Sequence, residues 1–101
     1  MSSYLTTEDS DSDEAEKSIQ LSPEEREETL ANITALKAEG NTLFSEANYE
    51  SALEKYTSAI NLGKKSGLPK DALILLNRSA TYLALKRYVP ALNDANQGLY
   101  K

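Results

Sequence analysis

The sequence LKAEGNTLFSEANYESALEKY, residues 36–56, decides the fold of this chain. Its small and apolar residues recur at helical spacing from Leu36 to Ala47, and again from Tyr49 to Tyr56. This spacing predicts two short helices that each bury one face. Because the break between them is only two residues long, the helices are expected to fold back on each other as a hairpin.

A second copy of this hairpin follows at a fixed offset of 39 residues. The matching pairs are Leu36 and Leu75, Gly40 and Ser79, Leu43 and Tyr82, Phe44 and Leu83, Tyr49 and Tyr88, Ala52 and Ala91, and Leu53 and Leu92. An internal repeat of this kind indicates stacked structural units. We expect an all-α fold with helices over about 23–47, 49–65, 69–86 and 88–101. No run alternates β-branched with polar residues, so no strand is expected.

Start and stop signals support these helices. Ser22 and Glu25 form a capping-box pattern ahead of the first helix. Asn48 is expected to adopt a left-handed conformation and end that helix. Gly67 is expected to end the second helix, and Pro69 to begin the third.

Composition narrows the classes of function. The 101 residues include no His, Cys or Trp, which removes disulfides, thiolate metal sites and the commonest general base. The sequence shows no nucleophile–base pair, metal cluster or Gly-rich phosphate loop. We therefore expect a protein that is not an enzyme and binds no cofactor and no metal.

The net charge of −5 is concentrated at the N-terminus. Residues 1–20 hold six acidic residues and one lysine, whereas residues 21–101 hold ten acidic and ten basic residues. We expect a disordered acidic tail over 1–21 and a neutral domain over 22–101. A neutral domain argues against binding of nucleic acid. No apolar run spans a membrane and no secretory signal is present, so a cytoplasmic location is expected, with the nucleus as an alternative.

The tail itself allows several interpretations. Thr6, Ser10 and Ser12 precede acidic residues, as acidophilic kinases prefer, which suggests a phosphorylated segment. The alternative is a solvated tail without a specific role. A further hypothesis is that the tail folds back on a basic groove of the domain and competes with a ligand.

Small residues at the helix contacts carry a family resemblance. Gly40 and Ser79 allow two helices to approach closely, and Ala52 and Ala91 accept that approach from the second helix of each hairpin. Over about residues 33–101 this arrangement resembles the tetratricopeptide repeat, with one repeat over about 33–66 and another over about 69–101. The resemblance implies a right-handed α-solenoid. The family's period is about 34 residues, so about five residues are inserted here, and we place them in 63–70.

A narrower resemblance lies in LKAEGN (36–41) and LNRSA (76–80). These segments look like the repeats of co-chaperones that bind the C-terminal tails of seventy- and ninety-kilodalton heat-shock chaperones. The resemblance implies that Lys37, Asn41 and Asn77 bind the terminal carboxylate of a Glu-Glu-Val-Asp peptide, with Phe44 lining the groove. Independently, Lys37, Asn41 and Phe44 share one helical face. A cation and two amides also suit a carboxylate.

The sequence departs from that subfamily in one respect. A third repeat would add a Lys and an Arg to the carboxylate site, and the chain stops before it. Two repeats also fall short of the usual three, and the last helix would leave Leu92 and Leu99 partly bare. We therefore expect a fragment of a longer protein, or self-association, and weak peptide binding. The alternative function is a repeat scaffold that recruits another protein through its concave face without recognising a carboxylate.

Overall fold

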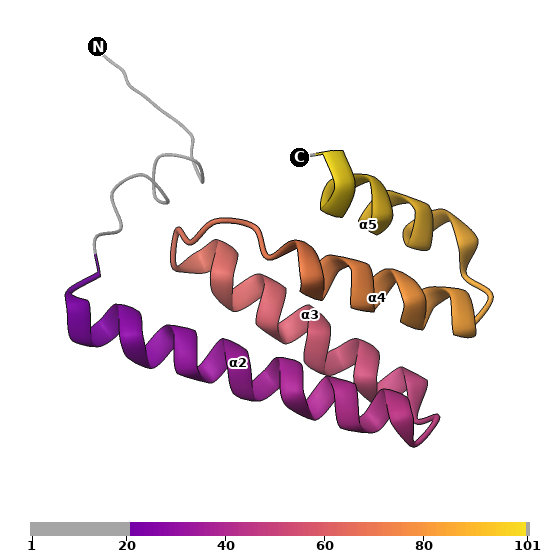
Figure 1. Cartoon of the computed structure of the whole chain (residues 1–101), viewed down its shortest axis with the longest axis horizontal. Helices are drawn as coiled ribbons and strands as arrows, with labels where there is room; N and C mark the ends of the chain where they lie inside the picture. The colour runs from indigo at the N-terminus through magenta and orange to yellow at the C-terminus, as the bar shows by residue number, and fades with distance from the viewer. Residues whose placement is uncertain (1–20, 101) are drawn as a thin grey trace, which may run out of the picture.

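The computed structural model describes residues 21–100, which form four helices in two adjacent hairpins (Figure 1). The helices are α2 (Pro23–Ser45), α3 (Tyr49–Lys65), α4 (Ala72–Ala84) and α5 (Tyr88–Tyr100). Helix α2 packs on α3, α4 packs on α5, and α3 joins the hairpins by packing on α4. No strand occurs within residues 21–100. The all-α fold of tetratricopeptide-type hairpins is confirmed. The predicted disordered tail falls on residues 1–20, which lie outside the described residues.

The two hairpins differ in length. Helix α4 begins and ends 39 residues after Ile33 and Ser45, so only the last part of α2 belongs to the repeat. Residues 23–32 are an additional N-terminal extension of α2. Helix α5 likewise corresponds to residues 49–61, and α3 continues for one more turn over 62–65. The first hairpin therefore projects beyond the second at the end where α2 begins and α3 ends (Figure 1).

Close contact between α2 and α3 depends on Gly40. A Cβ atom at this position would lie 2.6 Å from Cε1 of Tyr56, closer than real Cβ contacts. The buried centre around it is made from one face of each of the first three helices. Its buried members are Ile33, Ala52, Tyr56, Ala59 and Ile74. In the second hairpin Ser79 replaces Gly40, and its buried Oγ donates to the carbonyl oxygen of Ala91 at 2.7 Å.

The N-terminus of α2 has the predicted cap. The backbone N–H of Glu25 donates to Oγ of Ser22 at 3.1 Å, and the N–H of Ser22 donates to Oε1 of Glu25 at 2.9 Å. Each side chain thus satisfies one of the donors that a helix start leaves unpaired. The predicted capping box is confirmed.

Ala47, not Asn48, ends the first helix. Ala47 has the left-handed φ of 62°, while Asn48 has a φ of −92° and makes no side-chain cap for α3. The N–H of Asn48 donates to the carbonyl of Leu43, and that of Ala47 donates to the carbonyl of Phe44. This pair of bonds is a Schellman motif, whose geometry places the left-handed residue one position after the C-cap. The prediction for Asn48 was wrong by one residue.

The same motif ends α3 and α4. Gly67 has a φ of 70°, as predicted, and Lys86 has a φ of 63° at the position equivalent to Ala47. Because Ala47 and Lys86 leave the helical region, the first and third helices end two residues earlier than expected, at Ser45 and Ala84.

Pro69 does not begin the third helix. Helix α4 starts at Ala72, and Oδ1 of Asp71 accepts hydrogen bonds from the N–H groups of Leu73 and Ile74 at 3.0 and 3.3 Å. An aspartate with extended backbone is a strong N-cap. The helix therefore begins where its free N–H groups find an acceptor, three residues after the expected start.

Candidate functional site

Asn41 and Asn77 meet between the two hairpins. Asn41 follows Gly40 on α2, and Asn77 lies on α4. Nδ2 of Asn77 donates to Oδ1 of Asn41 at 3.1 Å. The stacking of the hairpins thus brings together two of the predicted site residues, which are 36 positions apart.

Tyr56 contributes a second hydrogen bond to the same oxygen. Its hydroxyl donates to Oδ1 of Asn41 at 2.5 Å, and the residue is only 1% exposed. Burial raises the pKa of Tyr56 above its ordinary value, so the hydroxyl keeps its proton and remains a donor. With two donors on its oxygen, the amide of Asn41 is held in one orientation.

From the sequence, Tyr56 is expected only to pack on the buried face of its helix. A signal for the polar role exists, because a buried tyrosine usually finds a partner for its hydroxyl where a phenylalanine would need none. The identity of that partner depends on how α2 and α3 are rotated against each other, which the spacing of apolar residues does not specify.

Phe44 lines the same hollow. The hollow has a volume of about 220 Å³, and its lining consists of Asn41, Phe44, Tyr56, Asn77 and Ala80. The ring of Phe44 also packs edge-to-face on Tyr49, with ring centroids 5.2 Å apart and an interplanar angle of 69°. Phe44 is therefore held in place by the first hairpin while it offers apolar surface to the hollow.

Lys37 lies on the same helix as Asn41, one turn before it. It is half-buried, and it is not among the lining residues. Within residues 21–100 it forms no ion pair. The structure thus joins Asn41, Asn77 and Phe44 around one hollow, whereas Lys37 does not line it.

The arrangement offers hydrogen-bond donors. Since Oδ1 of Asn41 accepts two bonds, both N–H groups of its amide remain for another acceptor. Asn77 uses one N–H on Asn41 and has one more. Three N–H groups beside an aromatic ring suit a carboxylate, whose two oxygens accept several bonds. Within the described residues, no group of acidic side chains could hold a metal ion.

Arg78, next to Asn77, was missed by the sequence analysis. Its Nε and Nη2 donate to the two carboxylate oxygens of Asp94 at 2.6 and 2.8 Å, and Nη1 donates to Oγ1 of Thr57 at 3.2 Å. The bond to Asp94 raises the pKa of Arg78 further. Asp94 is 3% exposed. Because one guanidinium bonds to α3 and α5 from α4, it fixes α4 and thereby supports the position of Asn77.

A signal for this network lies in the repeat. Arg78 and Asp94 are 39 residues after Glu39 and Lys55, which form an ion pair of their own at 3.1 Å. The two hairpins thus carry an ion pair at equivalent positions with the signs exchanged. A search for complementary charges at the repeat offset would have found both pairs.

Curated proteins similar to this chain include three with informative names. The chain is 38% identical over 77 residues to small glutamine-rich tetratricopeptide repeat-containing protein 2 of Saccharomyces cerevisiae, covering 76% of this chain and 21% of that protein. It is 42% identical over 59 residues to Hsp70-Hsp90 organizing protein 3 of Arabidopsis thaliana, covering 58% and 10%. It is 38% identical over 61 residues to heat shock protein STI1 of Saccharomyces cerevisiae, covering 60% and 10%.

The chain spans about a tenth to a fifth of the length of these relatives. No family model matches the sequence. No solved structure matches it at a significant level. None of the helices within residues 21–100 is long and apolar enough to cross a membrane. The paired hairpins, their small-residue contacts and the similarity to a repeat-containing relative support a tetratricopeptide-repeat domain in this chain.

Proposed function

We propose that this chain is a non-catalytic peptide-binding module of a co-chaperone or chaperone-linked adaptor. Its ligand is the free C-terminal carboxylate of a Glu-Glu-Val-Asp-type peptide from a heat-shock chaperone of the seventy- or ninety-kilodalton class. The observation that carries the proposal is the contact between Asn77 Nδ2 and Asn41 Oδ1, because it puts one amide from each hairpin in one hollow.

In this proposal the terminal carboxylate accepts from the remaining N–H groups of Asn41 and Asn77. The ammonium of Lys37 approaches from the neighbouring turn, and Phe44 contacts an apolar side chain of the peptide. Hydrogen bonds to a charged group contribute about 1.5–3 kcal/mol each. The name of one relative, Hsp70-Hsp90 organizing protein 3, supports this class of partner.

Calorimetric titration tests the proposal with two peptides that end in Glu-Glu-Val-Asp, one with a free carboxylate and one amidated. We expect the free acid to bind at least about tenfold more tightly, which corresponds to about 1.4 kcal/mol. Asn77→Ala should weaken binding of the free acid, and Lys37→Ala should remove the preference for it. Far-ultraviolet circular dichroism would verify that both variants remain helical.

Asn61→Ala provides the matched control, since Asn61 is an exposed asparagine of α3 that does not line the hollow. This variant should bind like the unmodified chain. Equal affinity for both peptides would reject carboxylate recognition. The chain would then be a repeat scaffold that recruits another protein through its concave face.

A further inference from the structure

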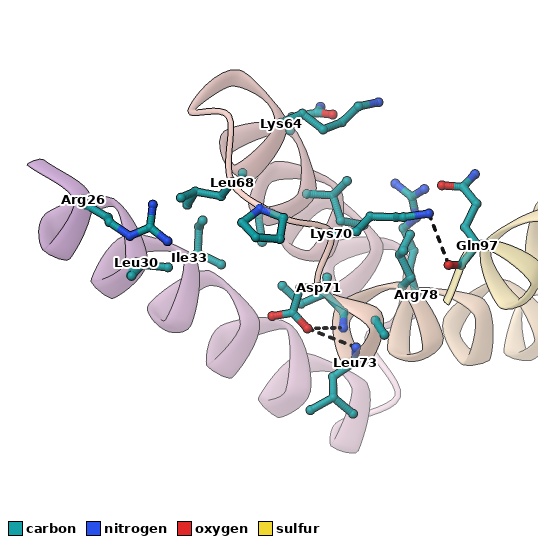
Figure 2. Close-up of a pocket in the computed structure, with 18 residues that line it drawn as sticks. Arg26, Leu30, Ile33, Lys64, Leu68, Lys70, Asp71, Leu73, Arg78 and Gln97 are labelled. Carbon is teal, nitrogen blue, oxygen red and sulfur yellow. Dashed lines mark hydrogen bonds between the residues drawn. The ribbon is translucent and has the colours of Figure 1, made fainter. Parts of the chain in front are cut away.

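A second hollow, here called the N-terminal groove, opens where the first hairpin projects beyond the second (Figure 2). It has a volume of about 630 Å³. Its walls are the N-terminal half of α2, the last turns of α3, the connection over residues 66–71 and the first turns of α4. The connection between the hairpins and the last turn of α3 thus form part of its boundary. It shares no lining residue with the hollow at Asn41 and Asn77.

The interior of the N-terminal groove is apolar and accessible. Leu30, Ile33, Leu68 and Leu73 line it. Leu30 is 44% exposed and Leu73 is 60% exposed. Exposed leucines that face one groove are a typical feature of a surface that another segment covers.

Three cations belong to the lining of the N-terminal groove. Arg26 comes from α2, Lys64 from α3 and Lys70 from the connection, as Figure 2 shows. Within residues 21–100 the ion pairs involve other residues, so these three charges have no acidic partner there. Lys70 makes only a 3.4 Å contact with the carbonyl oxygen of Gln97.

The other charged groups of the lining are already engaged. Arg78 is paired with Asp94. The carboxylate of Asp71 caps α4. The N-terminal groove therefore presents a net positive charge over an apolar interior, which suits an acidic segment with apolar residues near it.

We infer that the acidic segment 8–16 of this same chain docks in the N-terminal groove. This segment places six carboxylates within nine residues, namely those of Glu8, Asp9, Asp11, Asp13, Glu14 and Glu16. Apolar residues flank it, with Leu5 before it and Ile19 after it. The charge and the apolar character of the segment thus complement those of the groove.

The position of the segment along the chain supports this occupant. Glu16 and Glu8 lie five and thirteen residues before Leu21, so an extended chain reaches about 16 to about 43 Å from that point at about 3.3 Å per residue. Arg26, at one end of the groove, lies in the second turn of the helix that follows Leu21. A tethered segment also binds at an effective concentration that an independent peptide would not reach.

Four glutamates at the start of α2 carry like charge. They are Glu24, Glu25, Glu27 and Glu28, and all four are exposed. None of them lines the N-terminal groove. Repulsion from these residues therefore disfavours docking of the acidic segment on the exposed side of α2 and favours the side of the groove formed by Lys64 and Lys70.

The absence of cysteine from the chain provides a specific experiment. Ser12→Cys creates a single attachment point for a nitroxide spin label in the middle of the acidic segment. Paramagnetic broadening of backbone amide signals is then measured in the 101-residue chain. We expect strong broadening over residues 68–73 at about 0.1 M salt. It should be largely lost at about 1 M salt, where the screening length falls from about 10 Å to about 3 Å.

A matched pair of charge reversals distinguishes docking from random proximity. Lys64→Glu with Lys70→Glu removes two cations of the groove and should abolish the broadening over residues 68–73. Lys65→Glu with Lys86→Glu makes the same change in net charge at exposed lysines outside the lining and should leave it intact. Equal broadening in both double variants, or none at low salt, would overturn the inference.

A mixing experiment tests whether docking is intramolecular. Spin-labelled chains without isotope are mixed with isotope-enriched chains without a label. We expect no broadening over residues 68–73 of the enriched chain, whereas broadening there would show that the segment binds a second copy and would overturn the intramolecular assignment. Because the two hollows share no residue, failure of this test leaves the peptide-binding proposal unaffected.

Discussion

Gly40 shows how one missing atom determines the separation of two helices. An added Cβ would lie 2.6 and 2.8 Å from two ring atoms of Tyr56. That ring is 1% exposed and its hydroxyl is hydrogen-bonded, so it has little room to move. The position therefore requires glycine for its lack of a side chain rather than for its backbone freedom.

Gly40→Ala should lower the free energy of unfolding by about 1–3 kcal/mol, the usual cost of overpacking a core. Gly63→Ala is the matched control, because Gly63 also lies inside a helix but an added Cβ would meet only Ile33 Cδ1, at 3.8 Å. Alanine is the better helix former, so this variant should gain about 0.5–1 kcal/mol. Urea denaturation followed by circular dichroism measures both. A shift in the same direction for the two variants would contradict the argument.

Ala47 occupies a backbone conformation that glycine adopts more easily. Its φ of 62° costs free energy for any residue with a Cβ. We expect Ala47→Gly to raise the free energy of unfolding by about 0.5–1 kcal/mol, after allowance for the greater freedom of glycine in the unfolded chain. Asn48→Gly, at a φ of −92°, should bring no gain. The thermal midpoints of the two variants provide the comparison.

At the scale of elements, each hairpin has an ion pair at the same two repeat positions, but the two pairs differ in burial. Glu39 and Lys55 form an ion pair whose side chains are 41–56% exposed. Arg78 and Asp94, at the equivalent positions, are largely buried and bond through two parallel hydrogen bonds. An exposed ion pair contributes little to stability, whereas loss of one partner from a buried pair leaves a charge without compensation.

Arg78→Met should therefore destabilise the protein by about 3–5 kcal/mol, because it leaves the buried carboxylate of Asp94 without a positively charged partner. The double variant Arg78→Met with Asp94→Leu should recover most of that loss, since no buried charge remains. Lys55→Met in the first hairpin should cost less than about 1 kcal/mol. Denaturant unfolding of the three variants measures these differences. If the double variant is as unstable as Arg78→Met alone, the loss of stability comes from the lost hydrogen bonds of Arg78 and not from the unpaired charge of Asp94.

The helices themselves could be predicted from local signals. The offset of 39 residues located both hairpins, and Ser22, Glu25 and Gly67 marked ends that the structure has. The errors at Asn48 and Pro69 have one cause. Residue preferences suggested that Asn48 ends the first helix and that Pro69 begins the third. In the structure, the hydrogen bonds of the free N–H and carbonyl groups at the helix ends determine where each helix ends or begins.

The candidate site could be predicted only in part. The proximity of Asn41 and Asn77 follows from stacking two similar hairpins, so the resemblance was sufficient to suggest it. The bond from Tyr56 and the absence of Lys37 from the lining of the hollow depend on helix rotation and side-chain direction. The spacing of apolar residues does not specify helix rotation or side-chain direction accurately enough to predict a particular hydrogen bond.

At the scale of the whole molecule, α5 leaves an apolar face uncovered. Tyr88, Val89, Leu92 and Leu99 are 61–72% exposed. The partly bare Leu92 and Leu99 expected from the sequence are thus confirmed. Contiguous apolar surface of this kind favours association.

We expect the chain to associate with itself as its concentration rises, through this face of α5. Sedimentation velocity over a range of concentrations should show the increase in mass. Leu92→Lys with Leu99→Lys should return the protein to a monomer. Leu73→Lys, an exposed leucine on α4 in the N-terminal groove, should leave the association unchanged. A monomer at all concentrations would contradict this expectation.

One oxygen atom, Oδ1 of Asn41, links the interior of the first hairpin to its surface through the phenol of Tyr56. Phenylalanine at position 56 would fill nearly the same volume and release one of the two restraints on that amide. Selection for thermal stability alone would retain this replacement, whereas selection for binding of the peptide carboxylate would remove it. Laboratory evolution under the first pressure should therefore yield well-folded chains in which Asn77 alone orients the amide of Asn41 and the peptide binds more weakly.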